Sequence, residues 1–394
     1  MTKKIKYKIN YIVIVFLLAI AATQPIKADT ANISLLTCSP GEEIYSLFGH
    51  SALRYCDPTK NIDIVFSYGY FSFEKPNFVW LFVKGETDYM VGAVDYKTFI
   101  KEYQYRGSGV TEQILALDSL QKSNLLNNLI EDCKLQNRIY RYNYLYNNCT
   151  TKLRDKIFEQ INSDEINYTD SFRRTSIREE ITKYALPQTW SSFGINLLLG
   201  ADIDTPASRE TLQFLPINLL NDLANTNINT SPIVAEQKEL LHPIEKRKAP
   251  NHFTPFNSAL LLLLFTLIIM LCEIRSHKLF WWYDTLLMLV QGTSGILLLF
   301  MALFSEHPAV DNNYLVIWIN PVPLLLLPFV VYYGIKSKTM KFMWIQITMI
   351  SIFFLTAPFV PQTYPAPIFI FATAYLVRSL FHIYRLKICE LSLY

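Results

Sequence analysis

The sequence predicts an exported α+β domain followed by a transmembrane domain of five helices, and two observations lead to this fold class. Of the 394 residues, 51% are hydrophobic and the mean hydropathy is +0.19, which is too apolar for an ordinary soluble protein. The apolar residues also gather in the last third, whereas the first part alternates between short apolar segments and turn residues. Charged residues make up only 18% and the net charge is +3, so we expect no nucleic acid partner.

Residues 1–28 have the features of a secretory signal peptide. Lysines precede an apolar core between Tyr11 and Ala22, which is short for a membrane span, and residues 26–28 offer a cleavage site. An uncleaved anchor is the alternative. Either arrangement exports the residues that follow.

Residues 29–170 are expected to form one mixed domain, with His50 and Cys149 in it. Apolar or alternating segments such as "IDIVFSYGYF", bounded by turn residues, predict short strands up to about residue 120. Amphipathic helices are predicted at 119–136 and 149–161. Residues 171–254 are expected to be a helical extension close to the membrane, ending in a polar linker from residue 226.

Residues 255–394 hold five apolar stretches, each able to cross about 30 Å of hydrocarbon as a helix. Their approximate ranges are 256–273, 280–304, 314–334, 342–360 and 366–386. The loops after the first and third, and the C-terminal tail, carry Lys and Arg, whereas the loops after the second and fourth carry none. Because basic loops stay cytoplasmic, the exported domain and the two other loops are expected outside. Asp284 and Arg378 fall toward the cytoplasmic ends of their spans and are expected to pair or to anchor.

The stretch "YNYLYNNCTTKLRD", residues 142–155, places a cysteine at the start of a predicted helix. With Asn147 or Asn148 as N-cap, Cys149 lies in the first turn, where free N–H groups and the helix dipole favour a thiolate. Apolar residues follow at intervals of four, so Cys149 lies on the buried face of this helix. A thiolate there needs a base.

His50 is the candidate base, because it opens the predicted strand "HSALRY" and the two other histidines of the exported domain, His242 and His252, lie in the expected linker. The alternative is a buried structural thiol and a core histidine. A third group should orient the imidazole. The next strand and the turn after it offer Ser67, Tyr68, Ser72 and Glu74. Of these we favour Tyr68, with core packing as its alternative.

The spacing of the six cysteines does not indicate a disulfide framework. Four of them belong to the exported domain, where the compartment is oxidising. Cys38 and Cys56 flank His50 and are able to form a disulfide, although the spacing does not require one. No Cys or His spacing matches a zinc site, so we expect neither a metal nor another cofactor.

Several segments resemble one known family. "LLTCSPGEEIYSLFGHSALRYCD", "FSYGYFSF", "YRYNYLYNNCTTKLRD" and "FGINLLLGADID" with the later "FLP" resemble the Lnb N-terminal periplasmic domain, and "SEHPAVDNNYLVIWINPVPLLL" is similar to the outer loop and following helix of that family. The resemblance implies a permuted papain-like (NlpC-type) α+β domain, in which His precedes Cys, followed by a five-helix α transmembrane domain. The chain departs from the family pattern "FDF" at Ser72.

The resemblance also implies an activity. An acyl chain would move from a phospholipid to the amino group of a lipoprotein's N-terminal diacylglyceryl-cysteine, with Cys149 as nucleophile and His50 as base. The phospholipid donor, the diacylated lipoprotein acceptor and the lipid bilayer are then the partners. The implied location is the bacterial inner (cytoplasmic) membrane, with several spans and the catalytic domain on the periplasmic side.

Polar side chains outside the Cys–His pair are candidates for lipid binding. Three arginines are candidate phosphate contacts, namely Arg54, Arg141 and Arg154. At the outer ends of the second and third spans, the candidates for head-group binding are His307, Asn312, Asn313 and Asn320. Surface charge, loop solvation and helix capping are the alternatives.

Three other functions use the same sequence features. A phospholipase or thioesterase would use the same Cys–His pair with water as acceptor. A cell-wall amidase of the NlpC kind has no need of five membrane spans. A membrane scaffold that binds a partner would need no thiol chemistry. The sequence leaves the hydrolase and the scaffold open.

Overall fold

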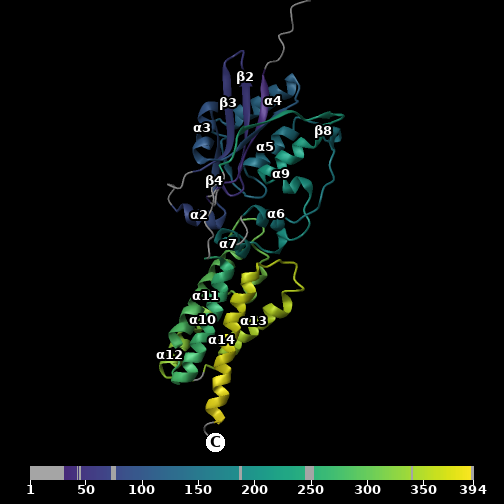
Figure 1. Cartoon of the computed structure of the whole chain (residues 1–394). Coiled ribbons are helices and arrows are strands. Elements are labelled where there is room, and N and C mark those ends of the chain that lie inside the picture. The colour runs from purple at the N-terminus through teal and green to yellow at the C-terminus, as the bar shows by residue number, and fades with distance from the viewer. Residues whose placement is uncertain are drawn as a thin grey trace, which may run out of the picture.

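The computed structural model describes a mixed domain that sits on one end of a helical bundle (Figure 1). The residues described are 31–391 without 42, 44, 45, 72–76, 186–188, 245–252 and 339. The predicted signal peptide, residues 1–28, therefore lies outside the described residues. So do Ser72, Glu74 and His252, and the side chain of Cys389.

A seven-stranded antiparallel sheet organises the N-terminal domain, with strand order β10-β5-β1-β2-β3-β4-β6. The strands are β1 (Asn32–Cys38), β2 (His50–Asp57), β3 (Ile62–Tyr70), β4 (Asp88–Asp95), β5 (Val110–Leu115), β6 (Ile139–Arg141) and β10 (Val234–Leu241). The interior strand β1 is buried from Ile33 to Cys38, on both faces. Helices must therefore cover the sheet on both sides.

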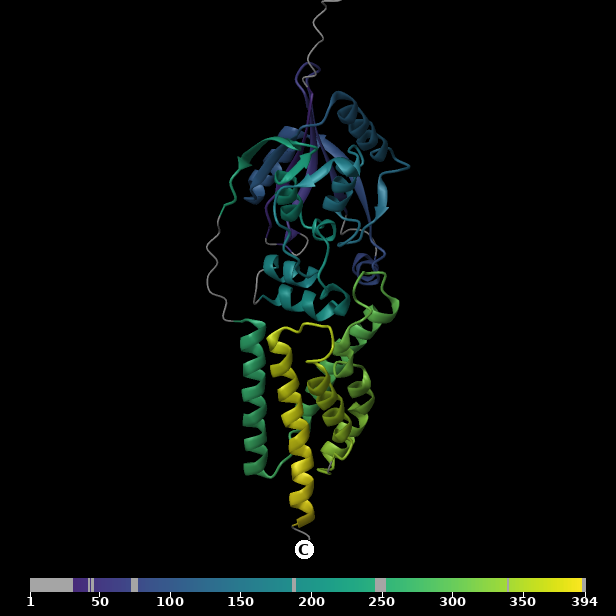
Figure 2. The ribbon, with the colours of Figure 1, turned by 90° about the vertical axis from the view of Figure 1, so that its right-hand side faces the viewer.

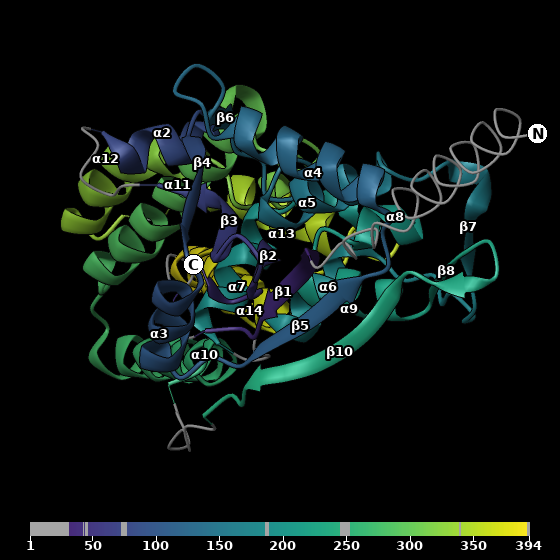
Figure 3. The ribbon, with the colours of Figure 1, turned by 90° about the horizontal axis from the view of Figure 1, so that it is seen from above.

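The helices divide the side chains of the sheet into two cores. On one face, Leu35 and Leu53 pack with Leu153 and other apolar residues of α4 (Ser119–Asp132), α5 (Cys149–Phe158) and α9 (Pro216–Ala224). On the other face, Leu36 and Ala52 pack against α3 (Tyr96–Arg106). Figure 3 shows α3 on one side of β2 and β3, with α4 and α5 on the other. Neighbouring residues of a strand point to opposite faces, so each strand contributes to both cores.

Smaller elements lie around the sheet and between it and the bundle. They are α2 (Phe78–Lys84), η2 (Ser163–Glu165), β7 (Ile166–Tyr168), α6 (Ile177–Tyr184), α7 (Trp190–Leu198), η3 (Ala201–Ile203), α8 (Arg209–Leu212), β8 (Thr226–Ile228) and β9 (Ser231–Pro232). Among them, β7, β8 and β9 form a three-stranded sheet. The predicted linker from residue 226 is wrong for β10, which pairs with β5 along the edge of the sheet. The middle of β10 is exposed, and an edge strand with polar side chains looks like a linker in the sequence.

The bundle contains α10 (Pro255–Ser276), α11 (Trp281–Phe304), η4 (Tyr314–Ile317), α12 (Val322–Ile335), α13 (Met343–Thr356) and α14 (Ala366–Leu391). Among the described residues, four helical segments are long and apolar enough to cross a membrane: Pro255–Ser276, Trp281–Phe304, Tyr314–Ile335 and Ala366–Arg385. The fourth predicted span, 342–360, is instead the 14-residue helix α13, with Pro358 just beyond its end. A straight crossing needs about 20 residues, so α13 is short for a complete span.

The two predicted outer loops contact the N-terminal domain. After α11, the Ser305 hydroxyl donates to the Val83 carbonyl at 2.8 Å. After α13, the backbone N–H of Thr363 donates to the carboxylate of Asp204 at 3.2 Å. The end of α14 lies at the opposite end of the bundle (Figure 2). This arrangement agrees with the topology predicted from the basic loops.

Three helices meet inside the bundle at a cluster of ionisable side chains, which we call the intramembrane cluster. Arg378 of α14 lies 2.7 Å from both carboxylate oxygens of Asp284 and 2.8 Å from both of Glu273. The His382 ring lies 3.0 Å from Asp284. All four side chains are at most 3% exposed. The predicted pairing of Asp284 with Arg378 is confirmed.

Candidate active site

Helix α5 begins at Cys149 because Asn148 caps it. The Asn148 side-chain oxygen accepts hydrogen bonds from the N–H groups of Thr150 at 2.8 Å and Thr151 at 2.9 Å, and the Thr151 hydroxyl accepts from the Asn148 N–H. The amide nitrogen of Asn148 donates to two loop carbonyls at 2.9 Å, which fixes the approach to the helix. The cap uses neither the N–H nor the thiol of Cys149, so both are left for chemistry.

His50 reaches Cys149 past the end of β3, at Gly69. This glycine has φ +105, and a Cβ built on it would lie 3.8 Å from Cys149 Cβ and 3.9 Å from His50 Cε1. Gly69 therefore stands between the two side chains, and a larger residue would be strained and would crowd both. The His50 ring is also close enough to the thiol to lower its pKa. The structure thus brings together the two residues predicted as nucleophile and base.

The surroundings favour the thiolate form of Cys149. Desolvation raises the pKa of this thiol, but the charge of His50 and the hydrogen bond from its ring lower it, and so do the Ser51 backbone N–H and the Thr150 hydroxyl; the resulting pKa is about 7. Burial instead raises the pKa of the Cys38 thiol. Cys149 keeps part of its surface exposed, whereas Cys38 is buried. Cys149 is thus both ionisable and accessible, which is the combination a nucleophile needs.

Ser67, and not Tyr68, is the group beside the imidazole. His50 Nε2 lies 3.3 Å from the Ser67 hydroxyl, and Tyr103 of α3 stacks on the ring with centroids 6.4 Å apart. The Tyr68 hydroxyl, which we favoured, instead donates to Asp132 at 2.5 Å. Neighbouring strand residues face opposite sides of a sheet, so Ser67 shares the face of His50 and Tyr68 lies in the other core. Since Nε2 contacts Ser67, the nitrogen left for the thiol is Nδ1.

Three tyrosines, Tyr89, Tyr140 and Tyr142, lie close enough to the thiol for its charge to act on them. Tyr89 of β4 stacks on Tyr142 with centroids 4.0 Å apart, and Tyr140 meets Tyr68 edge-on at 6.0 Å. Burial and then the charge of Cys149 raise the pKa of Tyr89 to about 12, and raise the pKa of Tyr140 and Tyr142 as well. The phenols therefore stay protonated. Within the part of the chain that is described, the buried Tyr140 hydroxyl has no hydrogen-bond partner, so it has a proton to donate.

Two family models match the chain over most of its length. Residues 20–183 match the Lnb N-terminal periplasmic domain, and residues 246–388 match the Lnb transmembrane domain. The chain belongs to the Lnb family. It is a membrane protein with a periplasmic domain. Neither the curated proteins nor the solved structures contain a match.

The three candidate arginines of this Lnb protein are engaged by its own acceptors. Arg54 is bound by Asp63 and Glu112 and stacks on Tyr96, 3.5 Å from the ring centroid. Arg141 bridges β4 to the loop after α11, through Asp88 at 2.8 Å and Glu306 at 2.6 Å. Arg154 contacts Asp155 and the Glu210 carbonyl. Their phosphate-binding role stays a prediction, and for each the contacts describe a structural role.

The four candidates beyond α11 also contact protein groups. His307 Nε2 lies 2.5 Å from the Phe82 carbonyl, and burial lowers the pKa of this ring, so it is a neutral donor. Asn312 donates to Asp202, Asn313 to the carbonyls of Leu197 and Leu198, and Asn320 to those of Val316 and Ile317. In the Lnb protein these residues hold the outer loop against the periplasmic domain and shape the start of the third span. Head-group binding by them stays a prediction.

The cysteines of the periplasmic domain are unpaired. In the register of β1 and β2, Cys38 faces His50, whereas Cys56 faces Asn32 at the other end. Six residues of strand separate the two thiols, a distance of about 20 Å, so they are too far apart for the disulfide left open by the sequence.

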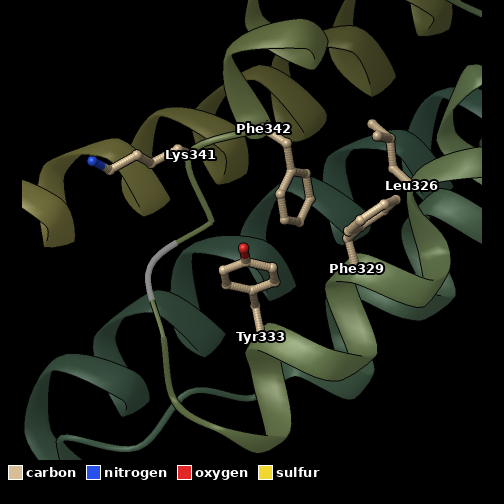
Figure 4. Close-up of a pocket in the computed structure, with 5 residues that line it drawn as sticks. All are labelled: Leu326, Phe329, Tyr333, Lys341 and Phe342. Carbon is tan, nitrogen blue, oxygen red and sulfur yellow. The ribbon is translucent and has the colours of Figure 1, made fainter.

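One cavity lies in the helical bundle, far from Cys149. It has a volume of about 440 Å³ and lies between α12 and the start of α13, near the predicted cytoplasmic side. Figure 4 shows the rings of Phe329, Tyr333 and Phe342 around it, with the Lys341 amine turned away. It contains no nucleophile and is not part of the candidate site.

Proposed function

We propose that this Lnb protein transfers an acyl chain from a phospholipid to the N-terminal amine of a diacylglyceryl-cysteine lipoprotein, through a thioester on Cys149. The observation that supports this is the position of Cys149 at the start of a helix, where its side chain and the His50 ring both lie beside Gly69 and the ring lowers the pKa of the thiol. The loop before it touches the membrane domain, because the Tyr144 hydroxyl donates to the Pro308 carbonyl at 2.8 Å. A reactive thiol close to the bilayer suits an ester donor that is itself a lipid.

The first step acylates the thiol. The Cys149 sulfur attacks the ester carbonyl carbon, so a C–S bond forms and the carbonyl oxygen becomes an oxyanion. The Cys149 N–H and the Tyr140 hydroxyl are the available donors for that oxyanion. When the C–O bond breaks, His50 gives its proton to the departing lysophospholipid oxygen.

The second step transfers the acyl chain. The neutral amine of the acceptor attacks the thioester carbonyl, a C–N bond forms and the C–S bond breaks. His50 takes the proton of the amine, which restores the imidazolium and the thiolate. The tyrosine rings near the thiol present apolar surface that disfavours water, so the amine competes with hydrolysis.

The same proposal includes the finer features of the architecture. The His50 strand precedes the Cys149 helix in a permuted papain-like (NlpC-type) order, within a catalytic domain at 29–170 that follows a signal peptide at 1–28. The extension at 171–254 leads to a membrane domain at 255–394, in which α13 would be the fifth helix of the bundle. The location would be the bacterial inner membrane.

Mass spectrometry of the purified full chain tests the proposal. Given vesicles of phosphatidylethanolamine and phosphatidylglycerol, the protein should gain one acyl mass on Cys149. A diacylglyceryl-cysteine peptide should then remove the acyl group and appear as the N-acylated product. If water removes the adduct equally fast and releases only fatty acid, the hydrolase is correct instead. If no adduct forms on a folded protein, thiol catalysis is wrong.

A further inference from the structure

Helix α2 exposes an apolar surface on the outside of the molecule. Six of its seven residues, FVWLFVK, are apolar, and none of them is buried. Val79 is 74% exposed, Trp80 53% and Phe82 45%. A continuous apolar surface of this kind normally marks a contact with a protein or a membrane.

The position of α2 favours a membrane. The Trp80 ring lies 5.0 Å from the ring of Phe300, near the outer end of α11. The backbone N–H of Glu306 donates to the Lys84 carbonyl at 2.7 Å, directly after that span. Gly85, with φ +74, packs so closely there that a Cβ would lie 2.7 Å from the backbone nitrogen of His307. Helix α2 is therefore fixed at the level where α11 leaves the membrane (Figure 1).

A row of aromatic rings, which we call the aromatic track, leads from α2 to the thiol. Successive ring centroids are 6.2, 5.9, 4.8 and 4.0 Å apart for Phe82–Phe78, Phe78–Phe71, Phe71–Tyr89 and Tyr89–Tyr142. The last two rings are those that the charge of Cys149 influences. Each ring stacks on the next, and Phe71 follows two residues after Gly69, whose Cβ position lies 3.8 Å from Cys149 Cβ, so the row leads from the level of the membrane surface toward the nucleophile.

We propose that α2 dips into the outer leaflet and that the aromatic track guides the acyl chain of a membrane phospholipid to Cys149. The inference rests on the proposed acyl transfer and names the path of its donor. An acyl chain fits because it is apolar and flexible, and because stacked rings contact it without needing hydrogen bonds. A peptide would need partners for its backbone, which a row of rings does not provide.

Two exposed residues give a matched pair of variants. Val79 and Leu120 are each the second residue of a helix and are 74% and 69% exposed, but Leu120 lies in α4, away from the bundle. An aspartate early in a helix is tolerated in both places. The measurement is Cys149 acylation of the full chain in vesicles, by vesicle phospholipid and by soluble p-nitrophenyl butyrate. For Val79→Asp the ratio of the two rates should fall roughly tenfold or more, because a charge resists insertion into the leaflet. Leu120→Asp should leave the ratio as it is.

Crosslinking identifies the occupant directly. Vesicle phospholipid with a diazirine in its acyl chain should label residues 78–84 of the Cys149→Ser protein. Labels confined to α10–α14, or equal ratios for the two aspartate variants, would overturn the inference. Labelling of α2 by a diacylglyceryl-cysteine peptide in place of the phospholipid would overturn it in favour of an acceptor site. If Cys149→Ser still transfers acyl chains, the proposed function fails, while the crosslink still reports whether α2 meets lipid.

Discussion

The intramembrane cluster and the candidate active site both contain ionisable groups that are largely shielded from water, and they differ in what they leave unpaired. In the intramembrane cluster, Arg378 is bound by both Glu273 and Asp284, and His382 adds a further contact. At the candidate active site, the Cys149 thiol has the His50 ring beside it, and part of its surface stays open. The ion pairs around Arg378 hold three helices together. Cys149 has a neighbouring ring and an accessible side, so its sulfur is free to react.

The difference follows from how each cluster is enclosed. Side chains from α10, α11 and α14 close around Arg378 from three directions, and all are nearly inaccessible. Cys149 lies where a helix begins beside the end of β3, and Gly69 leaves room there. Loss of a group should therefore damage chemistry at one cluster and stability at the other.

Cys149→Ser should have the largest effect on activity, a loss of about a thousandfold or more in acyl transfer, because a hydroxyl is a far weaker nucleophile here. Stability should change by less than about 1 kcal/mol, since the volumes are similar. Cys56→Ser is the matched control: it is another free, partly buried thiol of the same domain, and burial raises its pKa. Full activity in the Cys149→Ser protein would favour the scaffold.

Arg378→Leu should lower the stability of the protein and leave the reactivity of Cys149 unchanged. Removing the cation leaves Glu273 and Asp284 buried without their main partner, which typically costs roughly 3–5 kcal/mol. Thermal unfolding in detergent should therefore shift strongly downward, whereas the thiol of the protein that remains folded should react with iodoacetamide as before. A variant as stable as the original would show that the cluster does not hold the three helices.

The sequence predicted residues of both clusters but not which neighbours surround them. Cys149, His50 and the Asp284–Arg378 pair were predictable because each residue type is scarce in its segment. The sequence did not allow a choice between Ser67 and Tyr68, because that choice depends on which face of the sheet His50 occupies. The register of β2 and β3 decides this, since it places Ala52, on the same face as His50, opposite Ser67. Gly69 and Tyr89 carry no signal of their own, since their role depends on strands that meet only in three dimensions.

The hydrophobic pattern also predicted one helix that is longer than the helix in the structure. The stretch 342–360 is apolar almost throughout, yet α13 ends at Thr356, because Pro358 has no N–H to continue the hydrogen bonds of the helix. The aromatic track was equally hidden, since its rings come from three separate segments of the chain. Only the fold places these rings in a row.

Alkylation of Cys149 should depend on pH with a midpoint near 7. His50 favours the charged thiolate, so the folded-state pKa is depressed and the rate should rise as pH passes through 7 and then level off. In His50→Ala, desolvation is no longer opposed by the ring, so the midpoint should move above the ordinary thiol pKa of about 8.5. Peptide mass spectrometry reads each thiol separately, and Cys56, with its raised pKa, serves as internal control. If the midpoint of alkylation in His50→Ala stays near 7, His50 does not act on the thiol.

Ser67→Ala should have the smallest effect, a fall of about tenfold or less in acylation. Its hydroxyl only orients the imidazole, and one hydrogen bond is worth about 1 kcal/mol. Tyr68→Phe is the neighbouring control, because it removes a hydroxyl bonded to Asp132, a carboxylate that keeps Lys156 at 2.7 Å. A positioning role for Ser67 also predicts that its loss raises the alkylation midpoint slightly, since a mobile ring stabilises the thiolate less well. If Tyr68→Phe slows acylation more than Ser67→Ala, the ring is held from the other face of the sheet and the proposed arrangement is wrong.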